Sequence, residues 1–513
     1  MDFVIIYYAH KVNTQNRYKN QHTIFHCERK INMKKTVTRF APSPTGYMHI
    51  GNLRTALYSY LISKHDGGDF ILRIEDTDRE RLVEGATDVI LSTLSITGLD
   101  YDEGPIKGGE HGPYIQSDRK DIYKKYADIL VEKGYAYYCF CTKERLAQLH
   151  ENDATGGYDR HCRNLSAEEI ESELKKGTPY VIRQKMPTEG KTSYYDEVFG
   201  EISTDNSELQ DQILMKADGY PTYNFAHVVD DYLMGVTHVV RGSEYLTSTP
   251  KYVLLYDAFG WERPTYVHLP LLMGRNEDGS ISKLSKRHGA VSFQDLVADG
   301  YLPEAIVNYI ALLGWCPKNS EGEFFTLDEL KKEFSIEGVS KSPSVFDFDK
   351  LLWFNGEYIR KMEFSDFEKA IEPFIKSELP AFINKTKMLF LLCSRLDKLS
   401  SIEEKIQFFI NIPAYDAELF VNKKNKVTLE NAPQILSAAL PILENVKEWN
   451  NDSIYSSLLA LCEELAIKNG TLMWCLRIAV SGMAVTPGGA TEIMEVIGKD
   501  ESIARIKAAV AKF

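Results

Sequence analysis

Cysteine is scarce in this chain, and long uninterrupted runs of apolar residues are missing. Eight cysteines are spread over 513 residues. That sparse use argues against a disulfide framework and favours a reduced, cytoplasmic setting. The longest apolar runs, such as residues 3–9, fall far short of the roughly 20 residues of a membrane-spanning helix. We therefore expect no membrane segment.

Positive charge is also in deficit. Against 60 Lys and Arg residues stand 73 Asp and Glu residues, which gives a formal net charge of −13. This excludes a uniformly basic surface, although a local basic face could still serve a nucleic-acid partner. The hydrophobic fraction of 44% is that of a globular protein and excludes a disordered chain. At roughly 100–200 residues per domain, about three to five domains are expected.

The first 32 residues differ in character from the rest of the chain. They show no sustained hydrophobic period, and a strongly patterned sequence opens only at Met33. We interpret residues 1–32 as an upstream extension that is disordered. A basic targeting segment is the alternative, but the stretch contains no serine and no visible cleavage pattern.

The start of the patterned region predicts a strand, a loop, a helix and a second strand. Residues 36–40 alternate as a short strand, and residues 70–74 suit a buried parallel strand. Between them, apolar residues at helical spacing predict a helix from about residue 50 that Gly67 and Gly68 end. Polar residues follow both strands, at the edge where open α/β sheets bind ligands.

A histidine and a glycine stand at the entry to that helix, as His49-Ile50-Gly51-Asn52. Free N–H groups and a partial positive charge make a helix N-terminus suitable for phosphate. Gly51 leaves room for a purine against the backbone, and His49 could donate a hydrogen bond to phosphate. Alone, this pattern is more often an ordinary turn or cap.

A second polar segment lies far along the chain. Residues 283–289 read KLSKRHG, with two lysines and an arginine within five residues. A mobile basic loop of this kind can close over a triphosphate and meet the charge that develops during transfer. In isolation, a solvated surface loop is the simpler explanation of the segment.

Together the two segments resemble the signature motifs of the class I aminoacyl-tRNA synthetases. Residues 42–52 resemble the HIGH motif, and residues 283–287 resemble the KMSKS motif. Further segments look like the glutamyl/glutaminyl branch of that family: RFAPSPTG at 39–46, RIEDTD at 73–78, YPTYN at 220–224, VVDD at 228–231 and THVVRGSE at 237–244. The resemblance is specific up to about residue 314 and looser beyond.

The resemblance implies an α/β fold with a class I Rossmann-like catalytic domain, an inserted α+β acceptor-binding domain and an all-α C-terminal anticodon-binding region. No run of alternating strands is visible after about residue 350, which favours the bacterial glutamyl type over the β-barrels typical of the glutaminyl type. The expected divisions are residues 1–32 (extension), 33–110 and 219–282 (the two catalytic halves), 111–218 (the insertion), 283–360 (KMSKS-type loop and stem contacts) and 361–513 (anticodon-binding domain).

The activity that the resemblance implies is ligation of glutamate to tRNA. ATP would convert L-glutamate to glutamyl-adenylate and pyrophosphate, and the glutamyl group would pass to the 3′-terminal adenosine of tRNA(Glu). The expected partners are tRNA(Glu), L-glutamate and ATP with Mg²⁺; no membrane is involved, and the chain would act as a monomer. Three alternatives stay open: a glutaminyl-tRNA ligase, a tRNA-modifying glutamyl transferase and an inactive tRNA-binding scaffold.

A pocket for glutamate must meet two carboxylates and one ammonium group. Arg39 and Arg241 each lie at the end of a predicted strand, and a guanidinium group suits a bidentate grip on a carboxylate. A glutamine amide would leave that charge uncompensated, which gives selectivity without editing. Glu75 can accept the ammonium. The resemblance places glutamate at Arg39, Ala41, Ser43, Glu75, Tyr223 and Arg241.

The resemblance also implies the groups that act on ATP. His49 and Lys286 would be the catalytic residues, because both would stabilise charge on the phosphate during transfer. The implied ATP-binding residues are His49, Gly51, Asn52, Lys283, Ser285, Lys286 and Arg287.

The one tight cysteine cluster comprises Cys139, Cys141 and Cys162. Some family members hold zinc in the acceptor-end insertion with Cys-x-Cys followed by Cys-x-His. Here Asn164 replaces that histidine, and the neighbouring His161 would approach from a different direction. Because structural zinc takes four ligands, the three cysteines are candidates that lack a fourth, and structural zinc is not expected.

Overall fold

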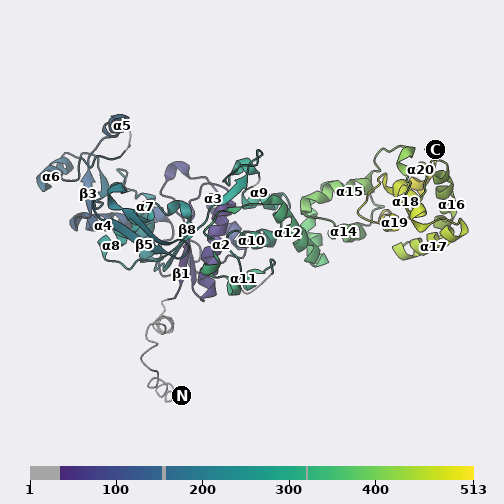
Figure 1. Cartoon of the computed structure of the whole chain (residues 1–513), viewed down its shortest axis with the longest axis horizontal. Helices are drawn as coiled ribbons and strands as arrows, with labels where there is room; N and C mark the ends of the chain where they lie inside the picture. The colour runs from purple at the N-terminus through teal and green to yellow at the C-terminus, as the bar shows by residue number, and fades with distance from the viewer. Residues whose placement is uncertain (1–34, 153–156, 290, 319–321) are drawn as a thin grey trace, which may run out of the picture. The chain divides into compact units, whose positions relative to one another are not determined.

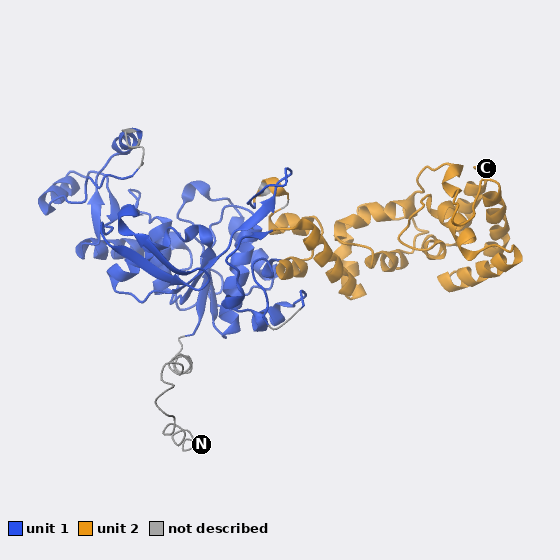
Figure 2. Cartoon of the chain, in the orientation of Figure 1, with its two compact units in different colours: residues 1–284, 310–345 blue, residues 285–309, 346–513 orange. Residues whose placement is uncertain are grey.

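A computed structural model describes residues 35–152, 157–289, 291–318 and 322–513. The expected extension, residues 1–32, lies outside the described residues. The chain divides into two compact units, which Figure 2 distinguishes by colour. Unit 1 comprises residues 1–284 and 310–345, and unit 2 comprises residues 285–309 and 346–513. Among the described residues, no helix combines the length and apolar character that crossing a membrane requires.

Unit 1 mixes helices and short strands (Figure 1). Its strands are β1 (Val37–Phe40), β2 (Asp69–Leu72), β3 (Ala136–Cys139), β4 (Val181–Gln184), β5 (Lys191–Asp196), β6 (Gly200–Asp205), β7 (Ile213–Met215), β8 (His238–Gly242), β9 (Thr265–Leu269), β10 (Leu272–Arg275), β11 (Ile281–Lys283) and β12 (Ser344–Val345). Its helices are α2 (Ile50–His65), α3 (Ala86–Ile96), α4 (Lys120–Glu132), α5 (Lys143–Asn152), α6 (Ala167–Lys175), α7 (Tyr223–Leu233), α8 (Thr249–Phe259) and α11 (Leu327–Glu333).

The described strands form four sheets, and two of them frame the candidate site. In the larger, ordered β6-β5-β9-β8, strand β9 runs parallel to both β5 and β8. In the smaller, β1 and β2 pair in parallel. Thr237, just before β8, links the two sheets: its N–H donates to the Val37 carbonyl (2.9 Å), and its hydroxyl accepts the Val37 N–H (2.8 Å). The beginnings of β1 and β8 therefore lie side by side, and near their ends Arg39 donates to the Val240 carbonyl.

The strand–helix–strand unit predicted from the sequence is confirmed in β1, α2 and β2. However, α2 is buried on most sides and does not present a single apolar stripe. Its polar residues find backbone partners: the Tyr58 hydroxyl donates to the Ala311 carbonyl (3.0 Å), and Arg54 donates to the carbonyls of Leu313 and Pro270. Satisfied in this way, polar side chains can occupy a buried helix face at little cost.

Unit 2 is helical, and no strand occurs in the part of it that the structure describes. Helices α16 to α20 gather around the C-terminus (Figure 1), and Arg505 on α20 donates to the carbonyls of Phe408 (2.8 Å), Phe409 (2.7 Å) and Val480 (2.9 Å). Its helices are α9 (Phe293–Ala298), α10 (Pro303–Ala311, which continues into unit 1), α12 (Phe348–Lys361), α13 (Phe364–Ile371), α14 (Lys385–Cys393), α15 (Ile402–Ile410), α16 (Asn431–Asn445), α17 (Asn451–Glu464), α18 (Asn469–Ser481), α19 (Ala490–Ile497) and α20 (Lys499–Val510).

The two glycines that end α2 provide a matched pair for a stability test. Gly67 has a φ of +65° with open space around a Cβ, so Gly67→Ala should cost about 1–2 kcal/mol of backbone strain. A Cβ at Gly68 would overlap the Thr36 carbonyl oxygen, which accepts the first hydrogen bond of β2. We expect Gly68→Ala to lower the free energy of unfolding by about 3 kcal/mol or more. Urea denaturation of both variants measures this, and equal losses would contradict it.

Candidate active site

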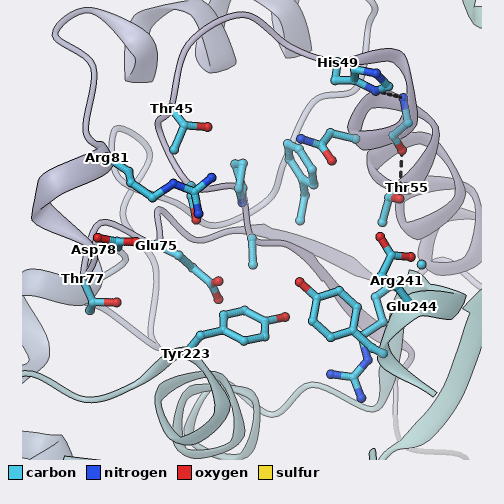
Figure 3. Close-up of a pocket in the computed structure, with 18 of the residues that line it drawn as sticks. Thr45, His49, Thr55, Glu75, Thr77, Asp78, Arg81, Tyr223, Arg241 and Glu244 are labelled. Atoms are coloured by element: carbon cyan, nitrogen blue, oxygen red, sulfur yellow. Dashed lines mark hydrogen bonds between the residues drawn. The ribbon is translucent and has the colours of Figure 1, made fainter. Parts of the chain in front are cut away.

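A cavity of about 1120 Å³ opens in unit 1 where β1, β2 and β8 end and α2 begins (Figure 3). The structure brings most of the predicted site residues to this one cavity. Those that line it are Arg39, Ala41, Ser43, His49, Gly51, Asn52, Glu75, Tyr223, Arg241 and Lys283. The remaining three, Ser285, Lys286 and Arg287, belong to unit 2 and are not placed against the cavity.

His49 is the N-cap of α2. Its Nδ1 accepts the N–H of Gly51 at 3.0 Å, so in the neutral ring the proton lies on Nε2. A Cβ at position 51 would lie 3.2 Å from Nδ1, which is why glycine suits this position. The sequence pattern allowed either a capping histidine or a phosphate donor, and the two roles use different nitrogens of the ring.

A buried group of charges lies behind the cavity wall. The Asp231 carboxylate on α7 accepts hydrogen bonds from Arg39 Nε (2.9 Å) and Arg73 Nη1 (2.8 Å) at one oxygen. Arg39 also donates from Nη1 to the Val240 carbonyl (3.1 Å). The two guanidinium groups hold the pKa of Asp231 well below its usual value, despite complete burial. Two of the three nitrogens of Arg39 are therefore committed to the protein.

The neighbouring Asp230 carries a second set of contacts. It accepts hydrogen bonds from Arg119 Nε (2.7 Å), Gln116 Nε2 (2.9 Å) and the Tyr123 hydroxyl (2.8 Å). In the sequence, Asp230, Asp231 and Arg73 are only marks of the family resemblance, with no role assigned to them. The available signal was a pair of adjacent acids within an otherwise apolar helix, which requires buried cations as partners.

Glu75 is a buried acid at the cavity wall whose charge is only partly balanced. Its Oε1 accepts hydrogen bonds from Arg73 Nη2 (3.1 Å) and Gln116 Nε2 (3.3 Å). Burial raises the pKa of Glu75 to about 7, although the positive charges of Arg73 and Arg39 oppose the shift. Figure 3 shows Glu75 and Tyr223 pointing toward the middle of the cavity. A cationic ligand there would favour ionised Glu75.

Arg241 is a buried cation with no carboxylate within ion-pair distance among the described residues. Its Nε donates to His268 Nε2 (3.2 Å) and its Nη2 donates to the Thr249 hydroxyl (2.9 Å). The third nitrogen, Nη1, is buried and has no hydrogen-bond partner in the described part of the chain. Tyr252 and Tyr245 place their rings 4.7 and 5.2 Å from the guanidinium carbon. A buried guanidinium group that lines a cavity and lacks both a carboxylate partner and one hydrogen bond favours an anionic ligand.

The three predicted cysteines of unit 1 do come together. Their sulfur atoms all lie within 4.8 Å of one another, and Cys141 and Cys162 are 3.5 Å apart. The Tyr158 hydroxyl, which sequence reasoning missed, lies 3.2 Å from the Cys139 sulfur and 3.7 Å from that of Cys141. Hydrogen bonds, first from the Cys162 thiol and then from Tyr158, lower the pKa of Cys139. A thiolate in a sulfur cluster of this kind could bind zinc.

Comparison with known proteins covers nearly the whole chain. The model of the family "tRNA synthetases class I (E and Q), catalytic domain" matches residues 35–353, and an anticodon binding domain model matches residues 357–510. Glutamate–tRNA ligases of Clostridium tetani and Clostridium novyi are each 54% identical, over 94% of this chain and 99% of theirs.

Comparison with solved structures points to the same family. A glutamate tRNA ligase from Elizabethkingia meningosepticum in complex with its amino acid is 34% identical, with a TM-score of 0.84 over 93% of this chain and 99% of that one. The glutamate–tRNA synthetase of Elizabethkingia anophelis is also 34% identical, with a TM-score of 0.85 over 93% and 100% of the two chains. These findings confirm the expected class I catalytic domain followed by a helical region. The chain therefore belongs to the E and Q family of class I tRNA synthetases.

Proposed function

We infer that the chain is a glutamate–tRNA ligase. One observation carries the choice of substrate: the cavity wall holds a buried cation, Arg241, with an unused donor and a buried acid, Glu75, with a raised pKa. An acidic amino acid brings an ammonium group to Glu75, one carboxylate to Arg241 and a second carboxylate to the Nη2 of Arg39, which has no hydrogen bond in the described structure. The curated relatives that match nearly the full chain are themselves glutamate–tRNA ligases.

Glutamate would bind with each charged group against its complement. The side-chain carboxylate would take the Nη1 donor of Arg241, and Glu75 would accept the ammonium, with the Tyr223 hydroxyl beside it. The other carboxylate would face the Nη2 of Arg39, the one nitrogen of that residue without a hydrogen bond in the described structure. Ala41 and Ser43, which follow β1 in the cavity wall, complete the proposed pocket.

ATP would bind at the start of α2, where Gly51 and Asn52 line the cavity. The α-carboxylate of glutamate attacks the α-phosphorus, the bond to pyrophosphate breaks, and glutamyl-adenylate forms. His49 and Lys286 would stabilise the charge on the phosphate, and Lys283, Ser285 and Arg287 would help to hold the nucleotide. Mg²⁺, which accompanies ATP, supplies further charge neutralisation. Positioning and electrostatics provide the rate, without a covalent enzyme intermediate.

The second step passes the glutamyl group to the 3′-terminal adenosine of tRNA(Glu). We propose that the insertion at residues 111–218 meets the acceptor end and that residues 361–513 meet the anticodon. The match of an anticodon binding domain to residues 357–510 supports the second assignment. We further propose domain boundaries at residues 110, 218, 282 and 360, a monomeric state and a cytoplasmic location.

Charging assays with separate glutamate and glutamine tRNA transcripts test the function. The wild-type chain should attach glutamate to tRNA(Glu) and should reject glutamine, whose amide cannot compensate Arg241. Arg241→Gln should raise the KM for glutamate about 100-fold, whereas Arg241→Lys, which keeps the charge but not the fork, should raise it less. The KM for ATP should change less than about threefold in both. Preference of the wild-type chain for glutamine would overturn the assignment.

The raised pKa of Glu75 predicts a pH dependence of glutamate binding. Below its pKa of about 7 the acid is protonated in the free protein and must lose a proton before it can pair with an ammonium group. The kcat/KM for glutamate should therefore rise about tenfold per unit of pH up to about pH 7 and then level off. Glu75→Gln should be less active, and its kcat/KM for glutamate should not show this rise with pH. A flat wild-type profile between about pH 5.5 and 8 would exclude Glu75 as the ammonium partner.

The cysteine cluster fits zinc better than its sequence pattern indicates. The expectation of no structural zinc rests on the histidine replaced by Asn164, but the Tyr158 hydroxyl lies beside two of the sulfurs and could be the fourth ligand. Titration of reduced protein with Zn²⁺ should show one ion bound per chain. Tyr158→Phe should weaken binding about tenfold or more, and Cys162→Ser should nearly abolish it. Equal zinc uptake by the wild type and Cys162→Ser would contradict this.

A further inference from the structure

The cavity-lining Arg241 is the first member of a buried chain of side chains that runs away from the cavity. Arg241 on β8 and His268 on β9 are direct partners in the parallel register of the two strands. Arg241 Nε donates to His268 Nε2 at 3.2 Å. The exposed fraction of Arg241 is 4%, and that of His268 is 0%. Their hydrogen bond is thus shielded from water on the side away from the cavity.

The chain of side chains ends on Asp196, the last residue of β5, which is also fully buried. His268 Nδ1 lies 2.6 Å from Asp196 Oδ2, which also accepts the backbone N–H of His268 at 3.1 Å. The other oxygen, Oδ1, accepts the N–H groups of Val198 (3.0 Å) and Phe199 (2.8 Å). Both oxygens are therefore held by two donors each, and the carboxylate has one orientation.

The polarity of this arrangement is fixed by its two ends. A guanidinium nitrogen only donates, so His268 Nε2 must carry the lone pair and Nδ1 must carry the proton. Asp196 accepts that proton in a hydrogen bond. Burial lowers the pKa of His268 below its usual value, which keeps the ring neutral. No other tautomer satisfies both neighbours, because a proton on Nε2 would face the Arg241 N–H.

Thr249 fixes a second nitrogen of the same guanidinium. Its hydroxyl accepts from Arg241 Nη2 at 2.9 Å and donates to the Tyr245 carbonyl at 2.8 Å. With Nε and Nη2 both held, the plane of the guanidinium is determined. The remaining Nη1 is the nitrogen without a partner in the described residues.

We propose that Asp196 and His268 are positioning residues for substrate selection, which fix Arg241 so that its Nη1 receives a carboxylate of glutamate. This proposal rests on the proposed function, in which Arg241 binds that carboxylate. Thus the arginine is oriented before the substrate enters.

A merely structural role for the pair would lower stability without changing substrate preference. Asp196 does cap the turn at Val198 and Phe199, so stability alone cannot distinguish the two roles. The decisive quantities are the KM for glutamate relative to the KM for ATP, and the ratio of glutamate to glutamine charging. Both are measured on the full chain with tRNA(Glu) transcript.

His268→Phe and His268→Gln form the matched pair. Phenylalanine offers no acceptor to Arg241 Nε, whereas the amide oxygen of glutamine can replace the lost lone pair. We expect His268→Phe to raise the KM for glutamate about 30-fold, to change the KM for ATP less than about threefold and to reduce the preference for glutamate over glutamine. His268→Gln should recover at least about tenfold of the lost affinity.

Asp196→Asn tests the far end of the arrangement with almost no change in shape. Its amide oxygen can stay with the backbone N–H groups of Val198 and Phe199, which leaves its NH₂ group facing both His268 Nδ1 and the His268 backbone N–H. That geometry favours the tautomer with the proton on Nε2, against the Arg241 N–H. The KM for glutamate should rise as in His268→Phe, although residue 196 has no contact with Arg241.

The outcomes separate this proposal from the one on which it rests. If Arg241→Gln keeps the wild-type KM for glutamate, the role of Arg241 fails and the positioning role fails with it. If Arg241→Gln raises that KM while folded His268→Phe and Asp196→Asn do not, only the positioning role fails. If His268→Phe does not fold, the comparison uses Asp196→Asn and His268→Gln. A raised KM for glutamate in Asp196→Asn together with a near-normal KM in His268→Gln supports the proposal. Equal KM values in these two variants overturn it.

Discussion

The pairing of two adjacent carboxylates on α7 with three buried guanidinium groups is the interaction on which unit 1 depends. Arg39 comes from β1, Arg73 follows β2, Arg119 precedes α4, and all three reach Asp230 or Asp231. Elements far apart in the sequence are thereby tied to one helix. Because all these groups are nearly inaccessible to water, removal of one partner would leave an uncompensated charge, at a cost of about 3–5 kcal/mol.

This network also sets the polarity of the cavity. Asp230 and Asp231 balance the charges of Arg73 and Arg119 and take the Nε donor of Arg39, whose Nη1 donates to the Val240 carbonyl. Glu75 is left with a raised pKa at one place on the wall, and Arg241 is left with an unused donor at another. A ligand with an ammonium group for Glu75, one carboxylate for Arg241 and a second carboxylate for the unused Nη2 of Arg39 completes all three. Selectivity for an acidic amino acid thus follows from what the network leaves unbalanced.

The sequence predicted the elements whose residues are close together along the chain. The period of apolar residues located β1, α2 and β2, and the polar residues after the strands located the cavity wall. The sequence could not show that α2 is buried on most sides. The partners of Arg54 and Tyr58 are backbone carbonyls near residue 311, more than 200 positions away along the chain. Nor could the sequence identify Tyr158 beside the sulfurs, since Tyr158 belongs to no motif and no periodic pattern.

His268 and Asp196 illustrate the same limit more sharply. Neither belongs to a motif: His268 lies in the mostly apolar strand β9, whereas Asp196 ends β5, whose alternating polar and aromatic residues suggest an ordinary half-exposed strand. Their roles arise from strand pairing: β8 and β9 align Arg241 with His268, and β5 joins β9 through Asp196 and Tyr266. A shift of one residue in either register would turn His268 or Asp196 to the other face of the sheet. The groups that hold Arg241 are therefore selected by backbone hydrogen bonds, and only the folded sheet makes them neighbours.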